Sequence, residues 1–454
     1  MDTQYPAQQT KSITAVRLAA RTAAFILGTA ALFCTQATAQ TFFADRFHHF
    51  DVGHGYGIPH QLGFEMDVLS FLRNAEYMMP YTVGFTSINC RLTPTLSYTI
   101  NDRARFTGGL QFDNIVGSDS IIHLFPFYRM EYEPTAWVRI VLGNIYGGAE
   151  HGLEDPLYDR ERNYFSYFYH PEAGVQVLTS TNRWKSDTWI DWEHYLNPWT
   201  HDQERFTIAT RHEFMLKQHG LLHASSGTRR ETDSLAPPSR LGISIPITAI
   251  VAHRGGQFSL MDTNNESLLN FHAGLRLTLT GTPRHAQQGL TYSTWSLYLP
   301  FFYFRDISGA DMANDSVGVY HHPFQNGWGM HPQLSWERPL FHSTKVLAPQ
   351  HPDLTKPREH YTYLSAALGY WHGRQYLSSR GSYLYQSACW TSDATFPKRS
   401  MLTLDTRLEH RYKGLAAGVD IQLYYDLDRH KSDYAYGLYM RWNILRRINR
   451  YQKG

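Results

Sequence analysis

The chain has 454 residues, of which 42% are hydrophobic and 15% aromatic, and its mean hydropathy is −0.42. After the N-terminal region no apolar run approaches the roughly 18 residues that a transmembrane helix needs, so a helical membrane protein is excluded. The formal net charge of +2 gives no reason to expect a nucleic-acid partner, because such partners are bound by strongly basic surfaces.

The N-terminus has the order of an export signal. Three basic residues precede an apolar stretch at residues 22–33, which is followed by the small-x-small triplet Ala37-Thr38-Ala39. This order is typical of a secretory signal peptide. We therefore expect residues 1–39 to be a signal peptide that is cleaved after Ala39. Its removal takes away three basic residues and one acidic residue, which brings the net charge from +2 to 0.

Residues 40–81 follow as a separate N-terminal segment. Phe64 to Leu72 fits either a first strand or a short helix. The remainder of the segment fits either a periplasmic extension or a plug folded into a lumen. The sequence thus predicts a signal peptide at 1–39, this segment at 40–81 and one continuous domain at 82–454.

From residue 82 onward the chain largely alternates apolar and polar side chains. Successive side chains point to opposite faces only in a strand, so this period predicts β-strands with one apolar and one polar face. Residues 82–100 are expected to form one strand or a bent pair. Further strands are expected at residues 104–114, 121–132, 137–144, 172–182, 183–195, 203–217, 240–253, 267–280, 288–304, 327–338, 359–376, 401–412, 419–427 and 434–444.

The last three strands allow a register to be predicted. If Lys413-Gly414 is a two-residue turn, Arg407 lies opposite Asp420 on the charged face. As a hypothesis that depends on the second turn, the final strand places Arg441 opposite Asp420 as well. The three side chains would then form an Arg-Asp-Arg ladder across the sheet.

Strand length separates the all-β classes. Strands in soluble proteins average about 5–6 residues, whereas a membrane-spanning barrel needs about 9–11. We therefore predict a transmembrane antiparallel β-barrel with long external loops. A mature chain of 415 residues, at about 26 residues per strand and connection, corresponds to about 16 strands, with a range of 12 to 18. Tyr434 and Tyr436 at one end of the last strand and Trp442 at the other are predicted to belong to the aromatic belts at the membrane surfaces.

Long polar connections are expected to be external loops. They lie at residues 147–171, 229–239, 305–315, 344–358 and 378–400. Within the first of them, Glu150 to Arg162 is dense in charge and contains a proline. This stretch fits a solvated external loop best, with an inward constriction as the alternative.

The polar faces of the strands supply the residues expected to line a lumen. Inward-facing charged residues are the normal composition of an open barrel. The predicted lumen-lining residues are Asp187, Asp191, Glu193, Arg276, Asp405, Arg407, Glu409, Arg411, Asp420, Asp426 and Arg441. Two inward aromatic residues, Trp189 and Tyr424, could offer stacking surfaces for sugars.

Two of these carboxylates allow a different interpretation. Asp191 and Glu193 are two residues apart on one face of a strand, which separates them by roughly 6.6 Å at the backbone. That spacing is compatible with the acid and base of a glycosidase. The alternative, which we favour, is that both are wall charges that pair with arginines of neighbouring strands.

The sequence predicts no catalytic residue, no metal site and no cofactor. It has no HExxH or CxxC spacing and no GxSxG. The adjacent His321 and His322 point to opposite faces if they lie on a strand, so they cannot bind one metal ion together. Only Cys90 and Cys389 remain in the mature chain, and whether they pair is not readable from the sequence.

The signal peptide, the alternating strands and the aromatic final strand resemble Gram-negative outer-membrane barrels. Residues 67–213 are also similar to uncharacterised outer-membrane proteins of Bacteroidota. The similarity rests on Asn74-Ala75-Glu76-Tyr77, Pro171-Glu172-Ala173-Gly174 and the acidic tryptophan-rich strand from Trp189 to Glu193. It implies an outer-membrane location, outer-membrane lipid around the barrel and assembly by the barrel-insertion machinery, and it implies no activity. The chain departs from such barrels in running past Trp442 into a basic C-terminal stretch.

The function expected from these features is a porin-like channel for the passive passage of small hydrophilic solutes. Its mixed wall charges predict weak ion selectivity. One alternative is an outer-membrane barrel enzyme, either a lipid hydrolase or a protease, with its site among loop or rim residues. Another is a soluble exported carbohydrate-active β-protein that uses Asp191 and Glu193.

Overall fold

The structure is a computed structural model. It describes residues 52–53, 55–77, 81–117, 123–159, 171–195, 203–217, 241–255, 266–280, 293–308, 322–342, 360–389, 392–412 and 415–448. The expected signal peptide and cleavage site, the loops predicted at 229–239 and 344–358, and His321 lie outside these residues.

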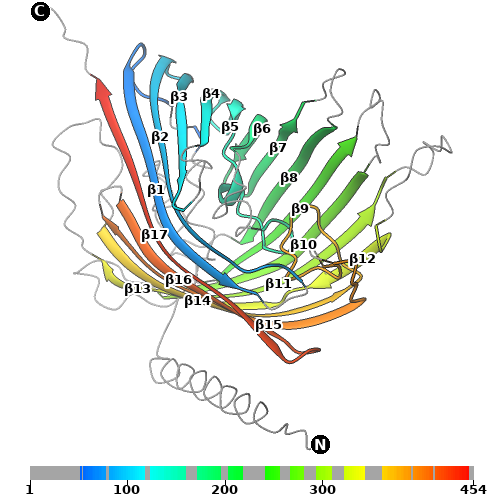
Figure 1. Cartoon of the computed structure of the whole chain (residues 1–454). Helices are drawn as coiled ribbons and strands as arrows, with labels where there is room; N and C mark the ends of the chain where they lie inside the picture. The colour runs from blue at the N-terminus through cyan, green and yellow to red at the C-terminus, as the bar shows by residue number, and fades with distance from the viewer. Residues whose placement is uncertain are drawn as a thin grey trace, which may run out of the picture. The chain divides into compact units, whose positions relative to one another are not determined.

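Antiparallel strands form a single closed wall (Figure 1). Within the described residues the strands are β1 (Leu62–Glu76), β2 (Phe85–Asn101), β3 (Ala104–Ile115), β4 (His123–Thr135), β5 (Val138–Asn144), β6 (Ala173–Ser180), β7 (Trp184–His194), β8 (Glu204–Lys217), β9 (Leu241–Gly255), β10 (Glu266–Thr280), β11 (Thr294–Asp306), β12 (Asn326–Met330), β13 (Gln333–His342), β14 (His360–Arg374), β15 (Lys398–Tyr412), β16 (Leu415–Asp426) and β17 (Lys431–Ile448). Apart from β12 and β13, each strand pairs with its neighbour in sequence, and β1 pairs with both β2 and β17, which closes the barrel.

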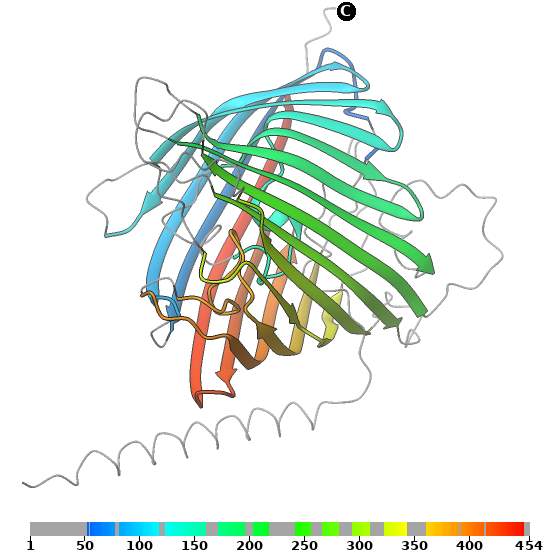
Figure 2. The ribbon, with the colours of Figure 1, turned by 90° about the vertical axis from the view of Figure 1, so that its right-hand side faces the viewer.

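The wall has sixteen strand positions. β12 and β13 both pair with β11 and β14, so these two short strands share one position. They are separated by His331-Pro332, where proline supplies no N–H group to the ladder. The prediction of a transmembrane barrel of about 16 strands is confirmed. Figure 2 shows the strands side by side around the wall at a marked tilt.

The register of the last hairpins confirms one prediction and corrects another. Arg407 lies opposite Asp420, as expected from a two-residue turn. Arg441 does not join them, because Asp420 lies opposite Gly437 in β17. Arg441 instead forms an ion pair with Asp67 of β1 at 2.6 Å. The alternation of faces determines only whether a residue points inward, whereas the length of the turn determines which residue it faces.

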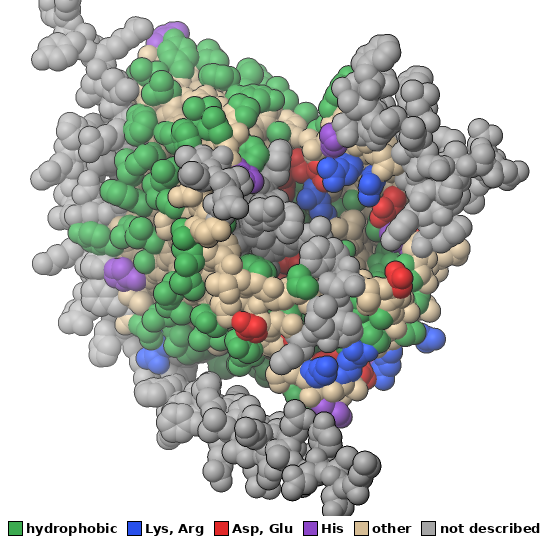
Figure 3. Space-filling view, in the orientation of Figure 1, with side chains coloured by type: hydrophobic (Ala, Val, Ile, Leu, Met, Phe, Trp, Pro, Cys, Tyr) green, Lys and Arg blue, Asp and Glu red, His purple; other side chains and the backbone are tan. Residues whose placement is uncertain are grey.

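The outer face of the wall is apolar. Leucine, isoleucine, phenylalanine and tyrosine side chains alternate with inward polar residues and remain exposed on the outside, for example Leu96, Leu368 and Leu438. Figure 3 shows hydrophobic side chains spread over much of the visible wall. An apolar outer face on a closed barrel is stable in a membrane, because every strand edge is paired and lipid covers the side chains. No helix among the described residues is long and apolar enough to cross a membrane.

The N-terminal segment contributes both to the wall and to its inner surface. Residues 62–76 form β1, so the strand alternative is the one that the structure adopts. Before β1, Val52 packs against Val141 and Leu178, which point into the barrel from β5 and β6. Tyr56 donates its backbone N–H to the carbonyl of Asp102 in the β2–β3 turn at 3.0 Å. The described part of this segment therefore lines the inner surface at the end of the barrel where that turn lies.

Two long connections fold inward and fill part of the lumen. Residues 145–159 follow β5. Residues 375–389 and 392–397 belong to the connection from β14 to β15 and appear in orange among the strands in Figure 1. Leu157 and Tyr376 from these loops are fully buried in one apolar cluster with Phe302 and Trp371 of the wall. Burial of a leucine or phenylalanine side chain such as Leu157 or Phe302 contributes about 1.5–3 kcal/mol relative to an exposed one.

This packing corrects the expectation of external loops at both places. The first loop also reaches both sides of the lumen, since Glu154 lies 3.8 Å from Arg276 of β10 and Glu150 lies 3.3 Å from Arg441 of β17. Sequence composition suggested solvated loops because the charged residues are conspicuous. The buried Leu153, Leu157 and Leu384 between them decide where the loops pack.

Candidate functional site

A buried histidine anchors the first loop to the wall. His151 ends a short 3₁₀ turn, Gly148–His151, and its ring stacks on Trp189 of β7 with centroids 3.6 Å apart. Nδ1 lies 2.8 Å from a carboxylate oxygen of Asp187, and Nε2 lies 2.8 Å from one of Glu172. Both ring nitrogens can donate only if the ring is protonated. The two contacts therefore indicate an imidazolium between two carboxylates.

The electrostatics of His151 agree with that assignment. Burial by itself lowers the pKa of the ring, but the carboxylates of Asp187 and Glu172 outweigh it and raise the pKa to about 10. For Glu172, burial by itself raises the pKa, and the His151 cation outweighs it and leaves the pKa below its usual value. The His151 ring and the Glu172 carboxylate are thus both ionised throughout the physiological pH range.

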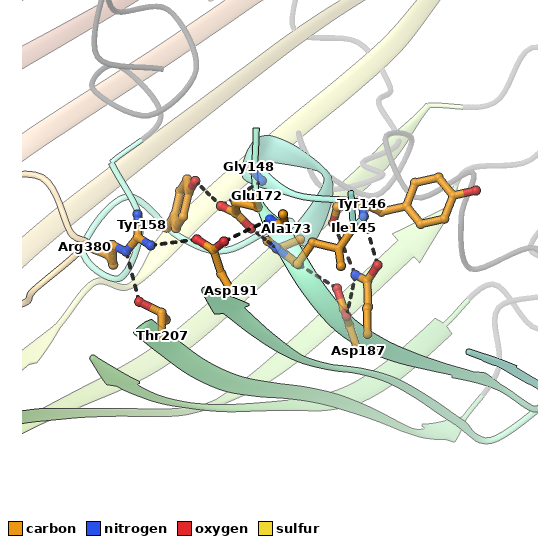
Figure 4. A network of polar contacts seen from close by, with 12 residues as sticks. Ile145, Tyr146, Gly148, Tyr158, Glu172, Ala173, Asp187, Asp191, Thr207 and Arg380 are labelled. Carbon is orange, nitrogen blue, oxygen red and sulfur yellow. Dashed lines mark hydrogen bonds and ion pairs between the residues drawn. The ribbon is translucent and has the colours of Figure 1, made fainter. Parts of the chain in front are cut away.

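The remaining acceptors of this network are also satisfied (Figure 4). Glu172 accepts hydrogen bonds from the Tyr158 hydroxyl at 2.7 Å and from the Gly148 backbone at 3.2 Å. Arg380, from the second inward loop, donates to Asp191 at 3.0 Å and to Glu193 at 2.5 Å. One guanidinium therefore joins the two carboxylates that had suggested a glycosidase pair.

This inner network has a structural role. The His151 and Asp187 side chains are fully buried, and the imidazole has no nitrogen left to accept a proton. Tyr158, whose pKa is raised well above its usual value chiefly by burial, stays protonated. The network pins the two inward loops to β6 and β7, and we name it the inner clamp: His151, Asp187, Glu172, Tyr158, Asp191, Glu193 and Arg380.

The other predicted lumen residues also lie on the inner face, mostly in ion pairs within or between strands. Arg276 contacts Glu213 at 3.0 Å, and Arg411 contacts Glu409 at 2.6 Å. The further pairs are Asp420 with Arg73 at 2.6 Å and Asp426 with Arg399 at 3.5 Å. Asp405 lines a small cavity under the first loop, and Arg407 lies 5.4 Å from the Tyr439 ring.

The aromatic predictions divide between the two faces. Tyr434, Tyr436 and Trp442 are exposed on the outer face of β17. Trp189 and Tyr424 point inward, but both are buried in the apolar cluster under the loops. They therefore offer no open stacking surface for a sugar.

A second polar group lies on the opposite, outward face of the wall. Arg73 of β1 points into the lumen toward Asp420, so its neighbour Asn74 and then Glu76 point outward. Thr86 of β2 donates to the Asn74 side-chain carbonyl at 2.6 Å, and the Asn74 amide donates to Glu76 at 3.3 Å. We name Asn74, Glu76 and Thr86 the outer triad.

The outer triad lies at one end of the barrel, among aromatic side chains. Asn74 pairs with Tyr436 and Glu76 pairs with Tyr434 across the β1–β17 ladder. Both Glu76 and Thr86 are exposed, while Asn74 is buried between them. A carboxylate on the outer face, beside Tyr434 and Tyr436, is within reach of lipid headgroups without passage through the lumen. Ionisable residues on a lipid-facing surface are rare and point to function.

The sequence contained the residues of this triad but not the triad itself. Asn74 and Glu76 belong to a motif that carried only a family resemblance, and Thr86 was not singled out. The sequence did carry one signal for them. Asn74 and Glu76 lie an even number of residues from Leu72 and Val68, so they share the apolar face of the strand, where polar side chains are unexpected. The partner on β2 could be identified only from the β1–β2 register.

The described residues offer no candidate site for metal or thiol chemistry. No group of three or more His, Cys, Asp or Glu side chains in this part of the chain is placed to hold a metal ion. Cys90 and Cys389 are both free thiols. Cys90 lies on the outer face of β2 and accepts a hydrogen bond from Ser70 of β1 at 3.4 Å.

Comparisons with known proteins give one family and several structures. The model of a family described as lipid A 3′-O-deacylase-type matches residues 56–343 and 357–450. No curated protein matches the chain. Solved structures that match include OprD of Pseudomonas aeruginosa (8% identity, 90% of this chain and 98% of that chain, TM-score 0.43) and OccAB4 of Acinetobacter baumannii (9%, 86% and 99%, TM-score 0.38). A loop-deletion mutant of OmpT of Vibrio cholerae also matches (9%, 84% and 99%, TM-score 0.39).

Proposed function

Because the chain belongs to the lipid A 3′-O-deacylase-type family, we propose that it is an outer-membrane hydrolase that removes an ester-linked acyl chain from a glycolipid of the lipid A type. The reaction is assigned to the outer triad of Asn74, Glu76 and Thr86. The observation that carries this proposal is a hydrogen-bonded polar group on the lipid-facing side of the wall.

The orientation of the barrel follows from its connections. Two or three residues connect β2 to β3, β4 to β5 and β6 to β7, and all three turns lie at one end. Short turns in outer-membrane barrels face the periplasm. The opposite end, where the outer triad lies, then faces the outer leaflet, in which such a glycolipid would reach it by lateral diffusion.

The outer triad has the groups that ester hydrolysis requires. The Glu76 carboxylate can take a proton from water as the water oxygen forms a bond to the ester carbonyl carbon. The Asn74 amide can turn from Glu76 to the carbonyl oxygen, which becomes negative in the transition state. When the carbon–oxygen bond to the sugar breaks, Glu76 returns the proton to the leaving alkoxide. Thr86 holds the Asn74 side-chain carbonyl and so orients its NH₂ group.

The test is direct measurement of acyl release. The refolded chain is placed in vesicles that contain lipid A, and released fatty acid and residual glycolipid are measured by mass spectrometry. The wild type is expected to release acyl chain, and Glu76→Gln is expected to release it about 10²–10⁴-fold more slowly. Asp102→Asn, which removes an exposed carboxylate in the β2–β3 turn at the other end, is the matched control. A wild type that leaves lipid A intact would overturn the proposal.

A second candidate function is the passage of small hydrophilic solutes through the lumen. It is favoured by charged inward side chains that keep partial exposure, such as Arg441 at 39% and Asp67 at 31%. The two inward loops oppose it, because they occupy part of the lumen. Planar bilayers separate the two candidates. Stepwise ohmic conductance of the Glu76→Gln variant would support a channel, and a silent bilayer with folded protein would count against it.

A further inference from the structure

Two cations face each other on the outer rim of the barrel. Arg374 ends β14, Lys398 begins β15, and the two residues are direct partners across the ladder. Both are exposed, and Arg374 shares the outward face of Leu368 and Tyr370. Among the described residues neither forms an ion pair with a carboxylate. Like charges directly opposite each other on one face destabilise a sheet. An anion bound between Arg374 and Lys398 would therefore relieve their mutual repulsion.

Aromatic side chains surround this pair. His372 lies two residues before Arg374 on the same face, and its ring is 6.4 Å from that of Tyr370 in a stacked arrangement. Trp328 of β12 pairs with Arg374 from the other side, and its ring is 5.6 Å from that of His372. Aromatic residues in barrels mark the level of the lipid headgroups. The two cations therefore lie at the depth where a headgroup phosphate is found.

The rim patch lies at the same end of the barrel as the outer triad. β15 and β17 both begin at this end, and β1, which carries Asn74 and Glu76, ends there. Lys and Arg side chains gather at the lower edge of the molecule in Figure 3, over the ends of the last strands. Lys431, the first residue of β17, is exposed in the same region.

We propose that Arg374 and Lys398, with the aromatic surface of Trp328 and His372, bind a phosphate group on the headgroup of an outer-leaflet glycolipid. The inference rests on the proposed function for the orientation of the barrel and the class of substrate. A phosphate monoester carries nearly two negative charges and three acceptor oxygens, which match two adjacent cations better than a single carboxylate does. The tryptophan and histidine rings can receive the face of the attached sugar.

The test measures binding separately from hydrolysis. The Glu76→Gln background prevents consumption of the ligand, and flotation with vesicles compares bisphosphorylated lipid A with lipid A from which the phosphates have been removed. The phosphorylated form is expected to bind more tightly. The double change Arg374→Gln with Lys398→Gln should weaken that binding about 25-fold, at about fivefold for each charge near a membrane surface, and should leave binding of the dephosphorylated form unchanged.

Two further variants control for folding and for nonspecific charge effects. Arg374→Lys with Lys398→Arg keeps both charges and should keep the preference for phosphorylated lipid A. Arg103→Gln removes an exposed cation from the β2–β3 turn at the other end and should change nothing. Equal binding of the two lipid A forms, or equal weakening by Arg103→Gln, would overturn the inference.

Competition by inorganic phosphate as strong as that by the phosphorylated glycolipid would also overturn it, because the patch would then be a site for the free anion. Failure of the wild type to release acyl chain contradicts the proposed function but not this binding result. The two outcomes are therefore distinguishable.

Discussion

The inner clamp and the outer triad are both clusters of polar side chains at the barrel wall, but they differ in how many of their charges have an ion-pair or hydrogen-bond partner. In the inner clamp, His151 is enclosed by Asp187, Glu172 and the Trp189 ring, and none of the four is exposed to any extent that would admit a ligand. In the outer triad, the Glu76 carboxylate is exposed and receives one hydrogen bond from Asn74 at 3.3 Å.

This difference separates a structural network from a candidate reaction site. A buried ion network is stable only when every partner is present, so it tolerates neither substrate nor proton transfer. A carboxylate that keeps free acceptor positions at the membrane surface can accept a proton from water beside a lipid. The predictions below sharpen this contrast, beginning with the largest expected effect.

Glu76→Gln should reduce acyl release by about 10²–10⁴-fold, the usual contribution of a general base. The amide has nearly the shape of the carboxylate but cannot take the proton. Thermal unfolding, followed by the heat-modifiable band on a gel, should stay the same because the side chain is exposed. Release at the wild-type rate would remove Glu76 from the reaction.

His151→Ala should have the opposite profile. It leaves Asp187 and Glu172 buried without their cation, which costs about 3–5 kcal/mol. Hydrogen exchange should show faster opening of residues 148–159, while acyl release per folded molecule stays close to normal. The exposed His430 is a suitable control, and His430→Ala should leave exchange in this loop unchanged. Loss of acyl release with normal loop protection would mean that the inner clamp takes part in the reaction.

The stability of the clamp should depend on pH in a defined direction. Because the folded-state pKa of His151 is about 10 and its ordinary value is 6.5, the stabilisation is fully present below pH 6.5 and is lost as the pH rises through about 10. Protection of the first loop should therefore fall between these values in the wild type, after correction for intrinsic exchange. The His151→Ala variant should lack this dependence. Protection that rises with pH in the wild type would contradict a protonated ring.

Thr86→Val should have the smallest effect. It removes the hydrogen bond that orients Asn74, a loss of about 0.5–1.5 kcal/mol, which corresponds to a roughly two- to tenfold reduction in rate. A positioning role predicts a fall in kcat with little change in KM, and rescue by Thr86→Ser. A fall in Thr86→Ser with a normal rate in Thr86→Val would indicate a packing role for the methyl group instead.

Local patterns in the sequence were sufficient to predict the strands of the barrel wall. The hairpin of β15 and β16 could be registered from its two faces, and Arg407 does lie opposite Asp420. Side-chain alternation is a property of each strand by itself, so it can be recognised without knowledge of the neighbours. The same alternation assigned the inward direction to Asp187, Asp191 and Arg276, which the structure places on the inner face.

What the pattern could not supply was the partner of each residue. Arg441 was expected opposite Asp420 and instead binds Asp67 of the first strand, because closure of the barrel joins the two ends of the described chain. Arg380 reaches Asp191 and Glu193 across nearly two hundred residues of sequence. Such contacts depend on the path of a loop, for which an isolated segment has no periodic signal.

The sequence by itself determined that the chain forms a membrane barrel of about sixteen strands and which face of each strand is apolar, because both follow from a period of two and from strand length. Only the tertiary structure decided that residues 145–159, 375–389 and 392–397 fold into the lumen, and that Thr86 meets Asn74 on the lipid-facing side. Those outcomes depend on long-range packing and on register between strands. The free energy of such a contact depends on two segments that are distant in the sequence, so the pattern of either segment alone does not predict it.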